Sequence, residues 1–326
     1  MGATMKDVAK LAGVGVGTVS RVLNNGSVKA TTRKKVEQAI DQLKYERDFY
    51  AKGLKTNKSN TVALILPSVW HPFFSEFAFY VENRLAAKNY KLYLCNSSPY
   101  PEKEKEYIQM VKQNKVDGLI GITYSDIDDY VSTNLPFVSF DRYFTEEVIY
   151  VTADNSYGSR LAVDELIKRG CTNLGYIGGY QEVPNETKNR RKYFEIECRE
   201  KNITHHILDL LEPLTDMPNK IKKFMVENPD IDGIFTINDS IAVQVIKVLA
   251  TMGIRVPEDV QVIGFDGQQI SEGSNYFVST IAQPIKEMAE TAVDLLVDVI
   301  NGKQVEHRTV FPVSFKEGGT TKPIQK

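Results

Sequence analysis

The spacing of apolar residues along the chain changes near residue 60. Before that point, apolar residues recur at three- and four-residue intervals, the spacing of short amphipathic helices. From Thr61 onward, near-continuous apolar runs alternate with longer amphipathic stretches. The first pattern predicts a small all-helical module, and the second predicts an α/β region whose sheets are covered on both faces.

The stretch from Met5 to Asn24 predicts two short helices that meet at a tight break. Ala9 is small enough for the helices to cross closely, and Gly13 suits the turn between them. The side chains expected to face inward are Val8, Leu11, Val19 and Val22. Those expected to point outward from the second helix are Thr18, Ser20 and Arg21. This arrangement predicts a helix-turn-helix, which presents polar side chains to base edges and phosphates.

A third helix is predicted after Thr31 and Thr32, because a threonine cap there precedes a helical spacing of apolar residues. The apolar residues concerned are Val36, Ala39, Ile40 and Leu43. Residues 47–55 are basic and contain Gly53, so they predict a short helix that is marginal alone in water. Residues 56–60 form a polar linker.

Apolar runs after residue 60 predict strands at residues 62–66, 92–95, 118–122, 137–140, 174–177, 234–236 and 260–265. Amphipathic stretches between them predict helices, among them 74–88, 156–169 and 240–252. Strands separated by helices in this way favour parallel sheets. The segment Val116–Ile120 recurs as Ile231–Phe235, which predicts two similar lobes.

Charge separates the same two regions. Residues 1–60 carry 12 Lys and Arg against 5 Asp and Glu, whereas the remainder carries 28 against 37. A basic head on an acidic body is typical of polyanion binding by the head. A cytoplasmic protein is expected, because no apolar run is long enough for a membrane helix and no secretory segment follows Met1. The cysteines lack metal-ligand spacing and are expected to be reduced structural thiols: Cys95, Cys171 and Cys198.

Polar and aromatic residues follow the predicted strands, where ligands bind in open α/β sheets. They lie at 68–74, 96–98, 124, 141–143, 238–239 and 265–267. Rings that cover C–H faces, together with carboxylates and amides that bond hydroxyls, suit a polyhydroxylated ligand. Each residue also has a structural interpretation: Trp70 and Phe74 as core or lid packing, and Asp239 as a helix cap. Taken together, the set favours a cleft.

Motifs along the whole chain carry a resemblance to one family. They are Asp7–Ala9, Ala12–Val14, Thr18–Arg21, Val116–Gly118, Asp154–Asn155, Arg169–Gly170, Val256–Val260, Gly264–Asp266 and Thr280–Pro284. With them the chain resembles bacterial transcription regulators of the lactose repressor and galactose repressor family over essentially all 326 positions. The resemblance implies an all-α helix-turn-helix head and an α/β core like a periplasmic binding protein, with two Rossmann-like lobes. It implies a homodimer, because no heptads follow Phe315 to make a tetramer.

The resemblance also implies domain boundaries. A helix-turn-helix domain is expected over residues 1–58, with a hinge helix at about 47–56. An effector-binding and dimerisation core is expected over residues 61–326. Within the core, the amino-terminal lobe is expected at about 61–157 plus 285–310, and the carboxyl-terminal lobe at about 158–284 plus 311–318.

Two sets of site residues are carried over from the family. Those implied to contact operator DNA are Thr4, Val16, Gly17, Thr18, Ser20, Arg21, Asn24 and Leu54, the last as a hinge leucine that wedges into the minor groove. Those implied to contact the effector are Trp70, Phe73, Phe74, Asn96, Tyr124, Asp141, Arg142, Arg190, Asn238 and Asp266. Among these, Arg190 and Asp266 are expected to clamp the effector's polar groups.

The chain departs from the family pattern in three regions: the second predicted helix, the hinge and the surroundings of Arg190. Gly15 stands where a serine is usual, so one helix cap is expected to be weak. Gly17 replaces a longer polar residue, which removes one base-reading side chain. The hinge has Arg47-Asp48 in place of Pro-Asn, and Tyr193 stands where the family has glycine, so a different cleft shape is expected near Arg190.

The resulting prediction is a transcriptional repressor of a carbohydrate operon, without enzymatic activity, metal or cofactor. A sugar or sugar phosphate in the cleft is expected to release it from a pseudo-palindromic operator. Phe140–Arg142 and Phe265–Gly267 resemble sucrose-type regulators of Gram-positive bacteria. The alternative within the family is a corepressor-activated or global catabolite regulator.

Other classes of protein fit less well. A dinucleotide-binding enzyme would need G-x-G-x-x-G after a strand, whereas Gly13–Gly17 follows a predicted helix and continues with Thr18. A hydrolase is disfavoured because no nucleophile-elbow pattern accompanies the histidines His71, His205, His206 and His307. A free solute-binding protein would need an export signal in place of the basic head.

Overall fold

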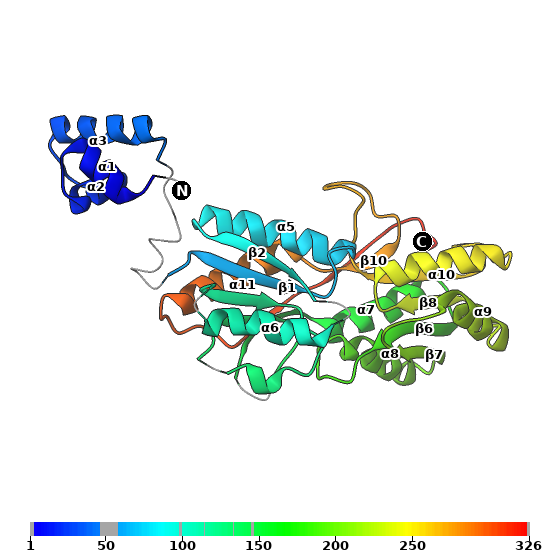
Figure 1. Ribbon diagram of the computed structural model, residues 1–326. Helices are drawn as coiled ribbons and strands as arrows, with labels where there is room; N and C mark the ends of the chain where they lie inside the picture. The colour runs from blue at the N-terminus through cyan, green and yellow to red at the C-terminus, as the bar shows by residue number, and fades with distance from the viewer. Residues whose placement is uncertain are drawn as a thin grey trace. The chain divides into compact units, whose positions relative to one another are not determined.

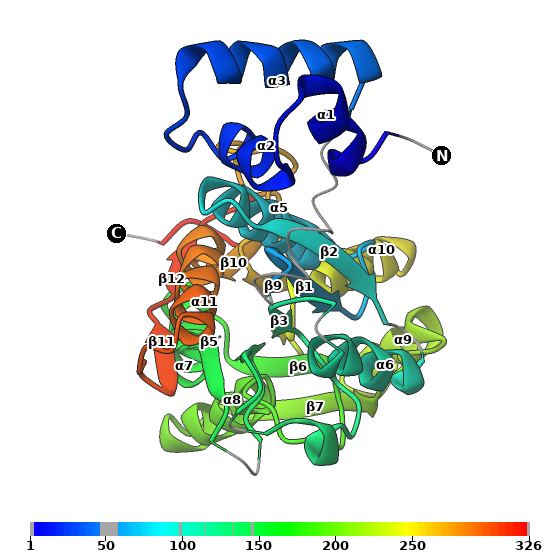
Figure 2. The same cartoon turned by 60° about the vertical axis from the view of Figure 1, so that its left-hand side comes forward.

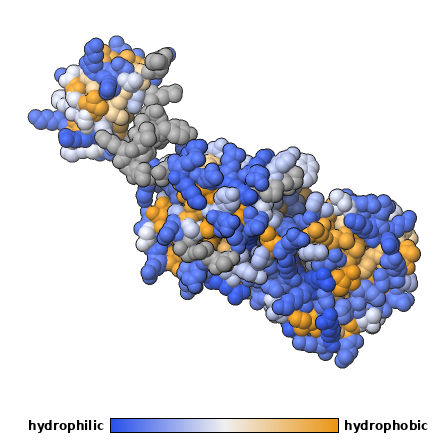
Figure 3. Space-filling view, turned by 60° about the horizontal axis from the view of Figure 1, so that its bottom comes forward, coloured by the Kyte–Doolittle hydropathy of each residue, from blue (hydrophilic) through white to orange (hydrophobic). Residues whose placement is uncertain are grey.

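The computed structural model describes residues 3–45, 58–97, 100–113, 115–132, 134–144 and 147–324. The chain divides into two compact units, residues 1–57 and 58–326, which are described separately (Figures 1 and 3). The predicted hinge helix, including Leu54, lies outside the described residues.

The first unit holds three helices, α1 (Met5–Ala12), α2 (Val16–Leu23) and α3 (Ala30–Leu43). Both ribbon views place α1 and α2 on the same side of α3 (Figure 2). A capping box starts α1, in which the backbone N–H of Asp7 donates to the Thr4 hydroxyl at 3.3 Å and the Asp7 carboxylate accepts from the backbone N–H of Thr4 at 2.9 Å. Gly13 ends α1 with φ 64°, so the predicted turn is confirmed.

Three valines form the centre of this unit's core: Val8, Val19 and Val36 are fully buried. The prediction for Leu11 was wrong, because its side chain is 46% exposed. Helix α1 turns the stripe Met5, Val8, Ala9 and Ala12 inward. Leu11 lies about 60° round the helix from Val8 and outside that stripe.

The predicted threonine cap of α3 was also wrong. The helix begins before both threonines, at Ala30, and its N-cap is Lys29, which makes no side-chain capping bond. The backbone N–H groups of Thr32 and Arg33 both donate to the Lys29 carbonyl, so Thr31 and Thr32 lie in the first turn. The buried positions predicted for this helix, Val36 and Ala39, are confirmed.

In the second unit, the first lobe is a six-stranded sheet in the order β11-β5-β4-β3-β1-β2. Its strands are β1 (Thr61–Leu66), β2 (Lys91–Asn96), β3 (Gly118–Gly121), β4 (Phe137–Phe140), β5 (Ile149–Ala153) and β11 (Arg308–Phe311), all parallel. Side chains alternate across β1: Val62, Leu64 and Leu66 pack with α5 (Pro72–Ala87) and α11 (Ile285–Ile300). Ala63 and Ile65 pack toward α6 (Pro101–Lys112) on the opposite face.

The second lobe repeats this plan in the strand order β12-β10-β9-β8-β6-β7. Its strands are β6 (Asn173–Tyr180), β7 (Thr204–Leu211), β8 (Gly233–Thr236), β9 (Gln261–Asp266), β10 (Ser279–Ala282) and β12 (Ser314–Lys316), the last antiparallel to β10. Its helices are α7 (Asn155–Lys168), α8 (Lys188–Glu200), α9 (Met217–Glu227) and α10 (Asp239–Thr251). Helix α8 covers one face of this sheet and α10 the other (Figure 1). The predicted α/β core of two lobes with mainly parallel sheets is therefore confirmed.

The internal repeat found in the sequence marks equivalent places in the two lobes. Asp117 precedes β3 and accepts from the backbone N–H groups of Ser59 (2.6 Å) and Asn60 (2.8 Å), at the start of β1. Asp232 precedes β8 and accepts from the N–H groups of Thr172 (2.8 Å) and Asn173 (2.9 Å), at the start of β6. Each aspartate thus links the start of its own strand to the start of the neighbouring strand: β3 to β1 in the first lobe and β8 to β6 in the second.

The cysteines behave as predicted from the sequence. Cys95, Cys171 and Cys198 are free and buried, and burial raises the pKa of each thiol to about 12. They therefore carry their protons at neutral pH. Within the described residues, no helix combines the length and apolar character that a membrane span requires.

Candidate functional site

The exposed side of α2 carries most of the residues predicted to contact DNA. Val16, Gly17, Arg21 and Asn24 are exposed, and Thr18 and Ser20 are half-buried. Asn24 donates from Nδ2 to the Ser20 carbonyl at 2.8 Å, which places it at the carboxyl end of the helix. Thr4 lies at the start of α1, where its hydroxyl donates to Asp7 at 2.6 Å.

Two glycines lie at the start of α2. The N-cap is Gly15, and it makes no side-chain hydrogen bond, as predicted. A Cβ atom at Gly17 would meet no other atom within 4 Å. The absence of a side chain at Gly17 therefore leaves open surface and removes no packing.

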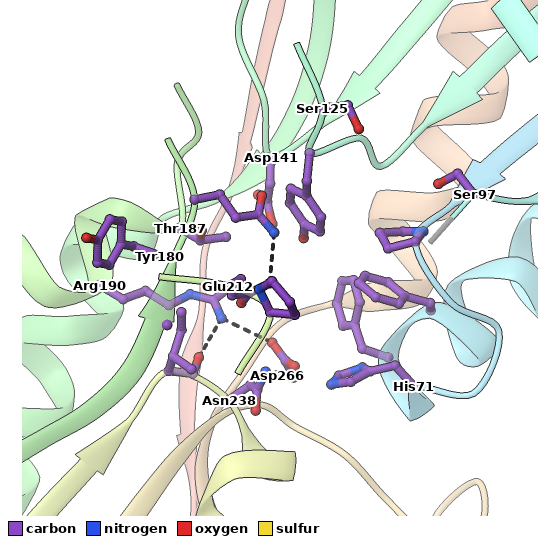
Figure 4. A pocket seen from close by; sticks show the side chains of 18 of the residues that line it. His71, Ser97, Ser125, Asp141, Tyr180, Thr187, Arg190, Glu212, Asn238 and Asp266 are labelled. Carbon is purple, nitrogen blue, oxygen red and sulfur yellow. Dashed lines mark hydrogen bonds and ion pairs between the residues drawn. The ribbon is translucent and has the colours of Figure 1, made fainter. Parts of the chain in front are cut away.

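In the second unit, a cavity of about 440 Å³ opens at the carboxyl ends of strands from both sheets (Figure 4). In each lobe the strand order reverses at the first strand, β1 or β6, and this switch point is where ligands bind in such sheets. Polar residues from the strand ends line the cavity: Ser97, Tyr124, Asp141, Tyr180, Glu212, Asn238, Asp266 and Gln283.

Seven of the predicted effector residues line this cavity: Phe73, Phe74, Tyr124, Asp141, Arg190, Asn238 and Asp266. These residues are up to 193 positions apart in the sequence, and the fold of the two sheets brings them together. The structure therefore brings most of the predicted constellation into one place.

Three predicted residues do not line the cavity. Trp70 is 93% exposed, on the loop before α5. Asn96 is exposed and accepts from the backbone N–H of Val69 at 3.0 Å, so it supports that loop. Arg142 is buried with Asp128, at 2.7 Å, and lies over the ring of Phe144. Arg142 follows Asp141 in the chain, so when Asp141 faces the cavity its neighbour faces the other way.

Tyr193 also lies elsewhere. Its ring centroid is 5.5 Å from the guanidinium of Arg160 on α7, and it is not among the residues that line the cavity. Any effect of Tyr193 on the shape of the cleft would therefore be indirect, and the predicted change in shape stays a prediction.

Arg190 is the best anchored residue of the cavity wall. It is 4% exposed and lies in the first turn of α8. Its Nε donates to Asn155 at 2.6 Å, and Nη1 donates to the Ile237 carbonyl at 2.7 Å and lies 3.4 Å from an Asp266 carboxylate oxygen. Figure 4 shows Arg190 and Asp266 pointing toward one another. These bonds fix the orientation of the guanidinium, whereas a flexible surface arginine would have no such fixed orientation.

Two buried carboxyl groups line the cavity, one from each lobe. Asp141 accepts from the Thr152 hydroxyl at 2.6 Å, and Asp266 accepts from the Gln283 amide at 2.9 Å. Burial raises the pKa of each to about 6, although the Arg190 charge opposes that shift in both cases. At neutral pH both are mainly ionised and able to accept hydrogen bonds from hydroxyl groups.

Several buried polar atoms of the cavity wall have no hydrogen-bond partner. They are Nδ1 of His71, Oε1 of Gln181 and Oε1 of Gln283. Burial lowers the pKa of His71, so its ring is neutral at pH 7. An unpaired buried polar atom is costly unless a ligand or water bonds it, so these atoms point to a polar occupant.

Several lining residues were not predicted from the sequence, among them Glu104, Gln181 and Glu212, whereas His71 falls within the predicted stretch 68–74. Glu104 is buried in α6, where it accepts from the Ser97 hydroxyl at 3.0 Å and burial raises its pKa. Glu212 follows β7 directly, and Gln181 follows β6. The ends of β6 and β7 would have indicated both residues, but the strand predicted at 174–177 ends three residues before β6 does, and no end was predicted for β7. Glu104 has no such local signal.

Comparison with known proteins supports both units. Residues 4–48 match the model for bacterial regulatory proteins of the lacI family, and residues 163–321 match that for a periplasmic binding protein-like domain. The chain is 34% identical over 323 residues to a sucrose operon repressor of Pediococcus pentosaceus, covering 97% of this chain and 98% of that protein. This chain belongs to the lacI family of bacterial regulatory proteins. It is accordingly a DNA-binding transcriptional repressor, and its matched amino-terminal segment contains α1, α2 and α3.

Solved structures agree with this family. A regulator from Alkaliphilus metalliredigens in complex with D-xylulofuranose is 32% identical, with a TM-score of 0.73 over 81% of this chain and all of that one. The lac repressor dimer bound to operator and an anti-inducer has a TM-score of 0.85 over 98% of this chain and 99% of that one. At 23% identity, that second likeness shows the fold alone.

Proposed function

We propose that this lacI-family repressor is a homodimer that leaves its operator when a neutral sugar occupies the cavity between its lobes. The observation that carries the proposal is the Arg190–Asp266 pair, held at 3.4 Å in the cavity wall beside polar atoms that lack partners. A guanidinium donates several hydrogen bonds in a fixed plane, and a carboxylate accepts from adjacent hydroxyls. Together they match the edge of a polyol.

The charge of the cavity favours a sugar without phosphate. Four carboxyl groups line it: Glu104, Asp141, Glu212 and Asp266. Among the described lining residues, Arg190 is the basic group that carries a charge at neutral pH, and its donors already serve Asn155 and Ile237. Arg142, the other arginine expected to hold a phosphate, is paired with Asp128 away from the cavity. A phosphorylated ligand would therefore meet more repulsion than attraction.

Aromatic rings supply the remaining surface. Phe73, Phe74, Tyr124 and Tyr180 line the same cavity, and rings of this kind cover the C–H faces of a sugar. The names of the relatives agree: one is a sucrose operon repressor, and one was solved with D-xylulofuranose. Which sugar fits here depends on the arrangement of its hydroxyls against His71, Gln181 and Gln283.

Release from DNA follows from linkage between the two sites. A sugar that binds the DNA-incompetent arrangement of the lobes more tightly shifts the population toward it. A hundredfold preference corresponds to about 2.7 kcal/mol. The alternative, a corepressor, would prefer the DNA-competent arrangement and tighten operator binding.

A thermal-shift screen of the full chain against neutral sugars and their phosphates tests the ligand class, because a ligand stabilises the fold that binds it. Fluorescence anisotropy with a footprinted operator fragment then tests the direction of the response. Stabilisation by a neutral sugar, with loss of operator binding, is expected. Tighter operator binding in the presence of that sugar would show corepression instead.

A further inference from the structure

A second hollow lies on the outer side of the second lobe, between α8 and the carboxyl ends of β6 and β7. It has a volume of about 570 Å³, within the range of small-molecule sites. Its lining residues are Tyr176, Gly179, Tyr180, Thr187, Lys188, Arg191, Lys192, Glu195, Ile196, Arg199 and Asp209, which we call the α8 groove. Gly179, Tyr180 and Thr187 also line the cavity between the lobes, so the two hollows share a wall.

The α8 groove carries more positive than negative charge, in contrast to the cavity. Four basic residues face two carboxylates there. Arg191 bonds Glu195 at 2.8 Å and Asp209 at 3.2 Å, and Arg199 bonds Glu195 at 2.8 Å, so the two arginines and two carboxylates satisfy one another. The excess charge therefore belongs to the lysines.

Lys188 and Lys192 are exposed and have no carboxylate partner among the described residues. The Lys188 ammonium donates to the Glu182 carbonyl at 3.0 Å, and the Lys192 ammonium lies 5.5 Å from the Tyr193 ring. Four positions apart on α8, they lie on one side of the helix. Lys188 is the first residue of α8, so the positive end of the helix dipole adds to the attraction for an anion.

Asp209 gives a second and independent sign of a ligand. Its side chain is only 4% exposed, and one carboxylate oxygen bonds Arg191. The other oxygen, Oδ1, is buried and has no hydrogen-bond partner. Leaving a buried acceptor unpaired is costly, and a hydroxyl group placed in the groove would satisfy it.

We propose that the α8 groove is a second ligand site, for a phosphorylated polyhydroxy compound. Its phosphate bonds Lys188 and Lys192 at the start of α8, and one of its hydroxyls donates to Oδ1 of Asp209. The Tyr180 ring covers part of the ligand from the shared wall. Through such a site the repressor would respond to an anionic ligand as well as to the neutral effector. The shared wall offers a route for coupling between the α8 groove and the cavity.

Isothermal titration calorimetry of the full chain tests this site with three probes: glucose 6-phosphate, glucose and inorganic phosphate. Glucose 6-phosphate is expected to bind more tightly than inorganic phosphate, which lacks the hydroxyls. The K188Q/K192Q variant should weaken glucose 6-phosphate binding about tenfold or more, because two charge-assisted hydrogen bonds are lost. The K222Q/K223Q variant changes the same charge on exposed residues of α9 and should bind like the wild-type protein.

Two further variants test whether glucose 6-phosphate binds in the α8 groove, in the cavity between the lobes, or to surface charge alone. Asp209→Asn should weaken glucose 6-phosphate binding while leaving inorganic phosphate unchanged. R190K, in the cavity wall, should leave glucose 6-phosphate binding intact. The proposal is overturned if no phosphate compound binds, if R190K removes glucose 6-phosphate binding while K188Q/K192Q does not, or if K222Q/K223Q weakens binding equally. Equal affinity for inorganic phosphate and glucose 6-phosphate would remove Asp209 from the site. Melting temperatures of all variants show whether each remains folded.

Discussion

Arg190 lies over the ring of Phe265, with 3.7 Å between the guanidinium carbon and the ring centroid, while the next residue of β9, Asp266, lies 3.4 Å from its Nη1. Two consecutive residues of one strand thus contact the same guanidinium. A cation above an aromatic face is attracted to the ring, and more strongly where water is excluded. Arg190 is for this reason oriented before any effector arrives, which reduces the entropy that binding costs.

The first prediction concerns the removal of this clamp. Arg190→Ala should lower effector affinity by a few kcal/mol, because Asp266 loses its partner and the effector loses its donors. Operator affinity without effector should stay near wild type, since Arg190 belongs to the second unit. Calorimetry with the sugar found in the thermal-shift screen measures the first quantity. Undiminished sugar binding by a folded Arg190→Ala protein would remove this residue from the site.

R190K serves as the control for charge. Lysine keeps the positive charge beside Asp266 but cannot form the planar fork or stack in the same way. It should fall between the wild type and Arg190→Ala in sugar affinity. Equal affinity of R190K and the wild type would show that charge alone matters.

How far the sequence predicts this site depends on strand boundaries. Asp141 and Asn238 lie within two residues after strands that apolar runs mark clearly, and Asp266 ends such a strand, so their convergence was predictable. Arg142 was not predictable in the same way. Neighbouring residues at the end of a strand face opposite sides, and no local sequence pattern records which side holds the ligand. Glu104 enters the cavity from a helix, through tertiary packing that the sequence does not display. The prediction for Leu11 was wrong because helix α1 buries the side that carries Met5, Val8, Ala9 and Ala12, and Leu11 lies beside that side.

The second prediction concerns pH. Asp141 and Asp266 have an ordinary pKa of 3.8 in the unfolded chain, and burial raises the pKa of each to about 6 in the folded protein. Between these values the folded state binds more protons than the unfolded state, so the free energy of unfolding falls as the pH rises from 4 to 6 and then levels off. The effect is at most about 3 kcal/mol for each group. Urea unfolding at pH 5 and pH 7 measures it.

Asp141→Asn and Asp266→Asn provide the matched controls. An amide does not titrate, so each variant should lose its share of the difference in stability between pH 5 and pH 7. The expected sign is a smaller gain on acidification than in the wild-type protein. If the free energy of unfolding differed between pH 5 and pH 7 by as much in both variants as in the wild type, the raised pKa values would not belong to these carboxyls.

The third prediction concerns helix α2. Gly17→Ala should stabilise α2 by about 0.5–1 kcal/mol, because glycine is entropically costly within a helix and nothing within 4 Å obstructs the added methyl group. Hydrogen exchange of the α2 amides in the full chain should slow about fivefold at the upper end of this range. Gly264→Ala is the contrasting variant, since its Cβ would lie 2.0 Å from an Asp239 carboxylate oxygen and should destabilise the core. Faster exchange in Gly17→Ala would contradict the open surroundings of this position.

The fourth prediction tests the repeated aspartates. Asp232→Ala should lower the free energy of unfolding by about 1–3 kcal/mol, because the N–H groups of Thr172 and Asn173 lose their acceptor. Asp117→Ala should have a similar effect in the other lobe. Asp230→Ala, at an exposed position two residues from Asp232, should change stability by no more than about 0.5 kcal/mol. Urea unfolding compares the three, and an Asp232→Ala protein as stable as Asp230→Ala would show that the repeat has no structural role.

The last prediction concerns the electrostatics of operator binding. Residues 1–60 carry seven more positive than negative charges, and Arg21 is exposed on α2, so phosphate contacts should supply much of the affinity. Operator affinity should therefore fall steeply as salt concentration rises. If each head of a dimer uses Arg21 on a phosphate, Arg21→Ala should reduce the slope of log K against log salt by about 2, one for each head. Lys222→Ala, which removes an exposed charge from the second unit, should leave the slope unchanged. Anisotropy titrations at several salt concentrations measure these slopes, and an Arg21→Ala slope equal to that of the wild type would mean that Arg21 neutralises no phosphate.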